Sequence, residues 1–350
     1  MRHGERTPLL KETYPNDPYK LSDYELLDFG QLTNKGKMTE YRLGTMLRHM
    51  YGHFLGSIYH PRDVYAISTD IDRTKLSLEL TLAGLYPPHE AQQWHPDVKW
   101  LGIPIHYTPQ KVDIVMKPQQ CPVYKAALKE VRNRSEVRDQ IAPYHDFFEF
   151  LSEKTGLTIT EPIHVYDLSG GLIAQRSMNL SLPEWCTDEV YQKIEELILL
   201  EYDLLSYTTE LKRLNGGFLV KSFINNMNPR NGNKPTRKIY IYSGHEINIA
   251  SFARAHNITD PIIPNFGSAF IVEKLRDEKQ NFYVRIHYWT GLTQQLITRK
   301  LEQCDEICPM DTYLKLMRAV IPSDAEASCL WDNITKEEML QLHAEKLYLN

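Results

Sequence analysis

Apolar residues in the first third of the chain follow two patterns, one typical of helices and one typical of strands. After Thr33, a residue type that favours the N-cap position, apolar side chains recur at helical spacing as far as Leu47. Residues 63–68 (DVYAIS) are a compact run of β-branched and aromatic residues, which predicts a buried strand. A leucine-rich helix follows and stops at Pro87, and residues 103–107 predict another short strand.

The pattern changes between residues 108 and 235. Helical periodicity dominates there, around residues 123–131, 144–151 and 189–205, and strand signals are weak. We therefore predict an inserted helical domain over residues 108–235. The flanking segments, 1–107 and 236–350, would form one α/β domain.

Strand patterns return after the predicted insert. Residues 237–243 (RKIYIYS) predict a strand, residues 247–256 a helix, and residues 269–274 and 282–288 two further strands, followed by a helical tail. Strands that alternate with helices on both sides of the insert indicate an α/β fold with a layered sheet.

Composition narrows the range of functions. The chain has 350 residues, of which 42% are hydrophobic and 24% charged, as in an ordinary soluble globular protein. The formal net charge of −5 argues against nucleic-acid binding, and no apolar run is long enough to span a bilayer. The sequence contains neither HExxH nor a CxxC pair, so we predict no metal and no cofactor.

The first eight residues, MRHGERTP, carry the strongest chemical signal. Arg2 and Arg6 present planar sets of donors that suit phosphate oxygens, and they bracket His3. Gly4 allows the backbone to approach an anionic ligand closely, and Pro8 favours a turn. A histidine between two such arginines can act as a nucleophile toward a bound phosphoryl group.

Two other polar stretches follow predicted strands. Arg73 comes shortly after the strand at 63–68, and His245 and Glu246 come directly after the strand at 237–243. In open α/β sheets, ligands bind at the carboxyl ends of the strands. We therefore expect these residues to meet Arg2, His3 and Arg6 around a phosphate.

The motifs RHGERTP, STDIDRT and YSGHE, in this order, resemble those of the histidine acid phosphatases, most closely the insect venom and lysosomal branch. The resemblance extends over nearly the whole chain, including GQLTNKGKMTEYRLG and CDEICP. It implies the phosphoglycerate-mutase-like fold, a three-layer α/β sandwich with a doubly wound mixed sheet and a smaller inserted helical domain. It also implies an acid phosphatase without a cofactor, acting on small-molecule or phosphoprotein phosphate monoesters, and it suggests a homodimer.

The resemblance also assigns roles to residues. His3 would be phosphorylated during the reaction, and Arg2, Arg6, Arg73 and His245 would bind the phosphate. The proton donor of the family is commonly an aspartate after the second histidine, and this chain has Glu246 at that position, as members of the insect branch do.

Cysteines and glycosylation sequons bear on the compartment. Five cysteines and four N-x-S/T sequons favour an oxidising secretory pathway, with reduced cytosolic thiols as the alternative. The sequons begin at Asn133, Asn179, Asn257 and Asn333. The family resemblance implies the disulfides Cys304–Cys308 and Cys121–Cys329 and a secreted or lysosomal location. It leaves Cys186 without a partner, because Ser268 lies near the expected position of that partner.

One departure from the family concerns the start of the chain. Family members have a hydrophobic strand before the RHG motif, in the centre of the sheet, whereas only Met1 precedes the motif here. We therefore expect a gap in the sheet. We also expect the chain as printed to be poorly folded or nearly inactive.

Three alternative functions fit parts of the sequence. DIDRT, starting at Asp70, fits the D-x-D-x-T motif of Mg-dependent aspartyl phosphatases, with Asp70 as nucleophile and Asp72 as general acid. That chemistry needs a later acidic pair to hold Mg²⁺, and the sequence contains no Asp-Asp and no Gly-Asp-x-x-x-Asp. Within the family, a phytase-like specificity is possible. A catalytically impaired secreted binding protein of the same fold is the third alternative.

Overall fold

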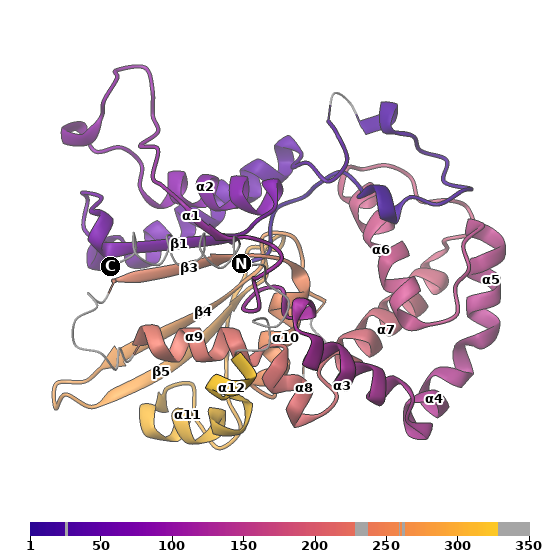
Figure 1. Cartoon of the computed structure of the whole chain (residues 1–350). Helices are drawn as coiled ribbons and strands as arrows, with labels where there is room; N and C mark the ends of the chain where they lie inside the picture. Colours follow the sequence, from indigo (N-terminus) through magenta and orange to yellow (C-terminus); the bar gives the residue numbers. More distant parts are fainter. Residues whose placement is uncertain (25–26, 228–236, 259, 261–262, 328–350) are drawn as a thin grey trace, which may run out of the picture.

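The fold was analysed in a computed structural model, which describes residues 1–24, 27–227, 237–258, 260 and 263–327. Two sheets lie side by side in the main body, with β3 and β4 at their facing edges (Figure 1). One contains β2 (His106–Thr108), β1 (Val64–Thr69) and β3 (Ile239–Ser243), in that order and all parallel. The other is antiparallel and contains β4 (Ala269–Arg276), β5 (Phe282–Trp289) and β6 (Leu296–Arg299), with β7 (Cys308–Pro309) also paired to β5.

Helices cover both faces of this strand layer, which gives the expected three-layer α/β sandwich (Figure 1). On one face lie α1 (Asn34–Leu55) and α2 (Asp72–Leu85), whose leucines pack against side chains of β1 and β3. On the other face lie α9 (Gly217–Met227), α10 (Glu246–Ala255) and α11 (Met310–Met317), which pack against β4 and β5. Burial of both faces explains why most positions of β1 and β3 are apolar.

Residues 1–3 connect the two sheets at one end of the gap between β3 and β4. The amide of Arg2 donates to the carbonyl of Ser268 at 2.8 Å, and the amide of Gly244 donates to the carbonyl of Met1 at 2.9 Å. The amide of His3 in turn donates to the carbonyl of Gly244 at 3.1 Å. The motif that carries His3 is therefore fixed by backbone hydrogen bonds on both sides.

A groove of about 740 Å³ extends from Met1 between β3 and β4. Each of these strands is the last of its sheet among the described residues, and both line the groove. Among the described residues no strand lies between them, and the missing strand that the sequence led us to expect stays a prediction. The expected effect of the gap on folding and activity stays a prediction.

Between β2 and β3 the regular structure of the described residues is helical. The helices are α3 (Pro122–Arg132), α4 (Ser135–Ile141), α5 (His145–Thr155), α6 (Pro162–Ser177), α7 (Asp188–Leu204), α8 (Thr209–Leu214) and α9. Helices α5, α6 and α7 share a separate apolar cluster, whereas α9 belongs to the cluster of the main sheet. The predicted boundaries of the insert, 108 and 235, therefore stay a prediction.

The other predicted elements are present with shifted ends. The strand expected at 103–107 is found at 106–108, because residues 101–105 run over α2 as an irregular segment. The sequence did not predict α6, whose apolar residues surround it too evenly for a clear helical stripe, or the short strands β6 and β7. The helical tail is present as α11 and α12 (Asp324–Ala327).

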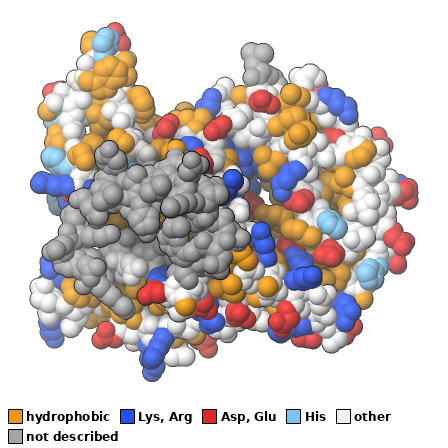
Figure 2. All heavy atoms as spheres, in the orientation of Figure 1, with side chains coloured by type: hydrophobic (Ala, Val, Ile, Leu, Met, Phe, Trp, Pro, Cys, Tyr) orange, Lys and Arg blue, Asp and Glu red, His pale blue; other side chains and the backbone are white. Residues whose placement is uncertain are grey.

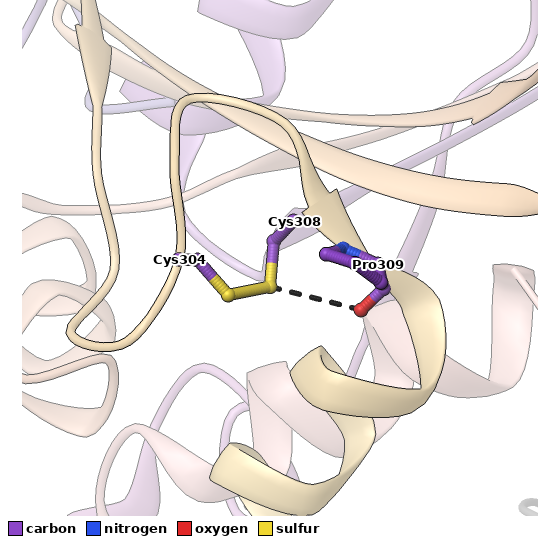
Figure 3. Close-up of a disulfide and its surroundings, with 3 residues drawn as sticks. All are labelled: Cys304, Cys308 and Pro309. Carbon is purple, nitrogen blue, oxygen red and sulfur yellow. Dashed lines mark hydrogen bonds between the residues drawn. A yellow bond between two sulfur atoms is a disulfide. The ribbon is translucent and has the colours of Figure 1, made fainter.

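The cysteines agree with the expected pairing as far as they are described. Cys304 and Cys308 form a disulfide that closes the loop before α11 (Figure 3). Cys121 is also disulfide-bonded, while its expected partner, Cys329, lies outside the described residues. Cys186 is a buried free cysteine, as expected.

The surface carries three of the four predicted glycosylation sequons and charges of both signs. Asn133, Asn179 and Asn257 are exposed, and Asn333 lies outside the described residues. On the face drawn in Figure 2, acidic and basic side chains are interspersed. Within the described ranges, no helix combines the length and the hydrophobicity needed to cross a membrane.

Candidate active site

Close packing around Gly4 sets the position of His3. A Cβ atom at Gly4 would lie 2.3 Å from the carbonyl oxygen of Gly36 in α1, so only glycine allows the two backbones to approach this closely. The amide of Gly4 donates to Ser77 Oγ in α2 at 3.2 Å. The two helices on this face of the sheet therefore hold the loop that carries the histidine.

The imidazole of His3 has the form that a nucleophile requires. Its Nδ1–H donates to the carbonyl of Gly4 at 2.9 Å, which leaves the lone pair on Nε2. The side chain is only 1% exposed. Burial and the nearby charges of Arg73 and His245 lower the pKa of His3 well below its usual value, which favours the neutral ring.

Arg2 and Arg6 are both buried and are held by different partners. The Nη1 group of Arg2 donates to the carbonyl of Pro264, and its guanidinium lies 4.0 Å from the centre of the Phe266 ring. Arg6 makes two hydrogen bonds to the carboxylate of Glu12, each 2.7 Å long. These contacts fix both guanidinium groups beside His3.

Arg73 and His245 follow the neighbouring parallel strands β1 and β3, as expected. Arg73 Nη2 donates to His245 Nδ1 at 3.5 Å, which leaves Nε2–H of His245 to donate to Thr69 Oγ1 at 3.2 Å. The rings of His245 and His3 meet edge to face, with their centres 5.5 Å apart. Burial and the charge of Arg6 lower the pKa of Arg73 to about 10, so the group remains a cation at any working pH.

Glu246 is the first residue of α10 and lies between two donors. Its Oε2 atom is 3.5 Å from Nε of Arg2, and its Oε1 atom accepts a hydrogen bond from the hydroxyl of Tyr166 in α6. Burial alone would raise the pKa of Glu246, but Arg2, His245 and the Tyr166 hydroxyl together lower it below its usual value. In this state the carboxyl is ionised.

All six predicted residues therefore converge on one site. The arginines each keep one buried nitrogen without a hydrogen-bond partner among the described residues, namely Nε of Arg2, Arg6 and Arg73. A buried donor without a hydrogen bond is costly, and Arg2 Nε has only the Glu246 carboxylate at 3.5 Å, so these groups around one histidine create a site for an anion. A phosphate would supply the missing acceptors.

Sequence reasoning missed several residues of the site. Glu12, Tyr166 and Lys117 lie in segments without a recognisable motif, although all three are close to the predicted residues. Burial and the charge of Arg73 lower the pKa of Lys117 to about 8. Thr69 was part of the STDIDRT motif, but nothing in the motif indicated its contact with His245.

The aspartates of the alternative motif lie apart from this chemistry. Asp70 forms an ion pair with Lys75 at 2.5 Å, and Asp72 is exposed. In the parts of the chain that the structure describes, no group of three His, Cys, Asp or Glu residues is arranged to hold a metal ion.

Comparison with known proteins shows the family to which the chain belongs. Residues 1–289 match the family described as Histidine phosphatase superfamily (branch 2). The chain belongs to this family and is therefore a phosphatase of the histidine type. The sequence is 38% identical over 333 residues to Venom acid phosphatase Acph-1 of Apis mellifera, with 94% of this chain and 85% of that protein covered. It is 30% identical to Lysosomal acid phosphatase of Homo sapiens, with 94% and 78% covered.

Solved structures resemble the chain in fold. The phytase from Citrobacter braakii superimposes with a TM-score of 0.69 at 17% identity, covering 93% of this chain and 97% of that structure. The phytase of Klebsiella sp ASR1 gives a TM-score of 0.67 at 17% identity, covering 93% and 96%. At this level of identity the likeness supports the histidine phosphatase fold and leaves the substrate open.

Proposed function

We propose that this protein is an acid phosphatase that hydrolyses phosphate monoesters through a phosphohistidine on His3. The observation that carries the proposal is that Arg2, Arg6 and Arg73 surround that histidine and each keep a buried Nε–H without a hydrogen bond, that of Arg2 lying 3.5 Å from Glu246 Oε2. These donors suit the three outer oxygens of a phosphoryl group in transfer. The acid phosphatases among the relatives support the same activity.

In the first half of the reaction, His3 Nε2 attacks the phosphorus in line with the ester oxygen. The N–P bond forms as the P–O bond to the leaving group breaks. Arg2, Arg6, Arg73 and His245 bind the outer oxygens, whose negative charge grows in the transition state. Glu246, protonated in the substrate complex, gives its proton to the departing alcohol oxygen.

In the second half, water replaces the alcohol. The Glu246 carboxylate takes a proton from this water, whose oxygen attacks the phosphorus as the N–P bond breaks. The products are inorganic phosphate and a free His3, and Glu246 carries the proton needed for the next turnover. Binding of the phosphate anion beside Arg2 offsets the cationic field that keeps Glu246 ionised in the free site.

Trapping of the covalent intermediate tests this mechanism. Acid-labile, base-stable label from a ³²P-labelled aryl phosphate should appear on His3 in the wild type and be absent in His3→Ala. Asp70→Asn is the matched control and should retain both label and turnover. Label on Asp70, or near-normal turnover of His3→Ala, would refute the mechanism. EDTA should leave hydrolysis unchanged.

Removal of one phosphate-binding arginine gives a second, quantitative test. Arg73→Ala should lose on the order of 3 kcal/mol of transition-state stabilisation, or about 100-fold in kcat/KM, as for loss of one oxyanion donor. Arg62 lies exposed at the other end of β1, so Arg62→Ala is a suitable control with unchanged activity. Full activity in Arg73→Ala would remove that residue from the site.

We also make proposals about the physiological substrate and the compartment. Lys117 adds a cation beside the site, which would favour substrates with a second anionic group and keeps a phytase-like activity as the second candidate. A panel of inositol phosphates, phosphopeptides and sugar phosphates compared by kcat/KM would separate these classes.

The disulfide Cys304–Cys308, the exposed sequons and the venom and lysosomal relatives support a secreted or lysosomal location. Sedimentation would test the homodimer.

A further inference from the structure

Tyr166 is the one aromatic hydroxyl that the structure places in contact with Glu246. It lies in the first half of α6, and its hydroxyl donates to Glu246 Oε1. Its ring packs edge to face against Tyr202 of α7, with ring centres 5.9 Å apart and planes at 71°. The ring is therefore fixed by packing while the hydroxyl points at the carboxylate.

Contacts one turn further along α6 fix the helix itself. Gly170 is four residues after Tyr166, on the same face of the helix. A Cβ atom at Gly170 would lie 2.4 Å from Glu12 Oε1, so α6 passes as close to the Arg6–Glu12 ion pair as a helix can. The face of α6 that presents the Tyr166 hydroxyl is thereby seated against the same loop that holds Arg6.

Both oxygens of Glu246 are then occupied by side chains from different parts of the chain. Tyr166 reaches Oε1 from α6, and Arg2 faces Oε2 from the first loop at 3.5 Å. A glutamate has three rotatable bonds, and without such contacts its carboxyl would sample several positions. Proton transfer requires the carboxyl to lie within hydrogen-bond distance of the leaving oxygen.

We propose that Tyr166 is a positioning residue that holds the carboxyl of Glu246 for proton transfer through its phenolic hydroxyl. The inference rests on the proposed role of Glu246 as proton donor. Tyr166 keeps its own proton throughout the reaction, and the proton that reaches the alcohol comes from Glu246. The helical segment between β2 and β3 thus takes part in the chemistry of the sheet-borne site.

The electrostatic surroundings give the expected direction of the effect. Burial and the charge of Glu246 raise the pKa of Tyr166 well above its usual value, so its hydroxyl is a donor at every working pH. A donor stabilises the ionised form of the carboxyl, so loss of the hydroxyl raises the pKa of Glu246. The other charged or titratable groups that face Glu246 are Arg2, Arg6, Arg73, His245, Lys117 and Tyr202. Tyr166→Phe leaves all of them in place.

The experiment compares wild type, Tyr166→Phe and Tyr202→Phe. The dependence of kcat on pH is measured with glycerol 2-phosphate, a poor leaving group that needs a proton, and with 4-nitrophenyl phosphate, which does not. For Tyr166→Phe with glycerol 2-phosphate, the alkaline limb should move upward by about half a pH unit or more. At the optimum kcat should fall about tenfold, with little change in KM. Tyr202→Phe removes a hydroxyl from the neighbouring ring and should keep the wild-type limb.

A wild-type alkaline limb in Tyr166→Phe, or the same shift in both variants, would overturn the inference. A merely structural role would lower the melting temperature without moving the limb. Glu246→Gln in the same assay distinguishes the role of Glu246 as proton donor from the positioning role of Tyr166. If Glu246→Gln keeps the wild-type limb, the proposed proton donor is wrong. If it abolishes the limb while Tyr166→Phe leaves it unmoved, only the role of Tyr166 is wrong.

Discussion

Arg6 and Glu12 form a two-point ion pair beside the nucleophile, with Nη1 donating to Oε2 and Nη2 to Oε1, each at 2.7 Å. Both side chains are buried, with exposures of 5% and 6%. Because both terminal nitrogens are engaged, Nε of Arg6 is the nitrogen left without a partner. The pair therefore holds the guanidinium plane and reserves one edge of it for an anion.

Glu12→Gln tests this relationship. The substitution keeps the shape but leaves a buried cation with one neutral partner, at a cost of about 3 kcal/mol in the free enzyme. A bound phosphate would then neutralise a charge that Glu12 had balanced. We therefore expect inorganic phosphate to raise the melting temperature of Glu12→Gln more than that of the wild type, while kcat falls. Differential scanning fluorimetry with and without phosphate measures the shift in melting temperature, and steady-state kinetics measures kcat.

The matched control is Glu130→Gln, which breaks an exposed helix-surface pair with Arg134. Exposed pairs contribute less than about 1 kcal/mol, so this variant should melt and respond to phosphate like the wild type. An equal phosphate response in Glu12→Gln and the wild type would mean that Glu12 does not control the charge at the site.

The sequence predicted the chemistry of the site better than its supports. Arg73, His245 and Glu246 were found because they follow strand patterns, and parallel strands deliver their ends to one edge. Arg2, His3 and Arg6 were found from the residue types of the RHGERTP motif itself. Glu12 and Tyr166 were missed because their roles depend on how a loop and α6 pack in space, which no local pattern records. The role of Gly170 in α6 can be recognised only in the structure, which shows how closely the helix approaches Glu12. The same limit applied to β6 and β7, which are too short for a period of two to show.

Glu246→Gln should separate substrates by leaving group. Glutamine keeps the hydrogen-bonding shape but cannot donate a proton as the P–O bond breaks. Hydrolysis of glycerol 2-phosphate should fall at least about 100-fold, whereas the first step with 4-nitrophenyl phosphate should fall far less. Burst kinetics with the aryl substrate isolates that step from dephosphorylation. Equal loss for both substrates would show that Glu246 positions the substrate without protonating it.

Asp113 should make stability depend on pH. It is 2% exposed, its Oδ1 accepts from the amide of Met116, and its Oδ2 has no partner among the described residues. Burial raises the pKa of Asp113 from 3.8 to about 6. Between these values the folded state holds a proton that the unfolded state has released. Its contribution to stability is therefore complete below pH 3.8 and is lost as the pH rises through about 6.

Asp113→Asn removes this dependence, because the amide is neutral at every pH. At pH 7 the variant should be more stable than the wild type by on the order of 2 kcal/mol, and at pH 4 the two should be similar. Urea melts at both pH values measure the difference. Asp139→Asn, at an exposed position, is the control and should track the wild type. A pH-independent difference would mean that Asp113 is ionised in the folded protein.

The groove between β3 and β4 begins at the first residue of the chain. At its end the amine of Met1 donates to the carbonyl of Tyr242 at 2.7 Å, and burial lowers the pKa of that amine to about 6. Backbone groups along the facing edges of two strands have no strand between them among the described residues. Such a gap in a sheet costs an amount comparable to the whole net stability of a domain, about 5–15 kcal/mol. We expect a strand that fills this groove to stabilise the protein.

An apolar strand of about five or six residues fused ahead of Met1 tests this expectation. It would continue the extended direction of residues 1–3, replace the buried amine with an amide, and pack against the groove lining, which includes Leu43 and Ile241. Both the melting temperature and the turnover should rise, because His3 would gain a continuous strand as its anchor. A Gly–Ser extension of equal length is the control and should change neither. If the chain as printed already melts cooperatively with full turnover, the hydrogen bonds of residues 1–3 alone suffice to place His3.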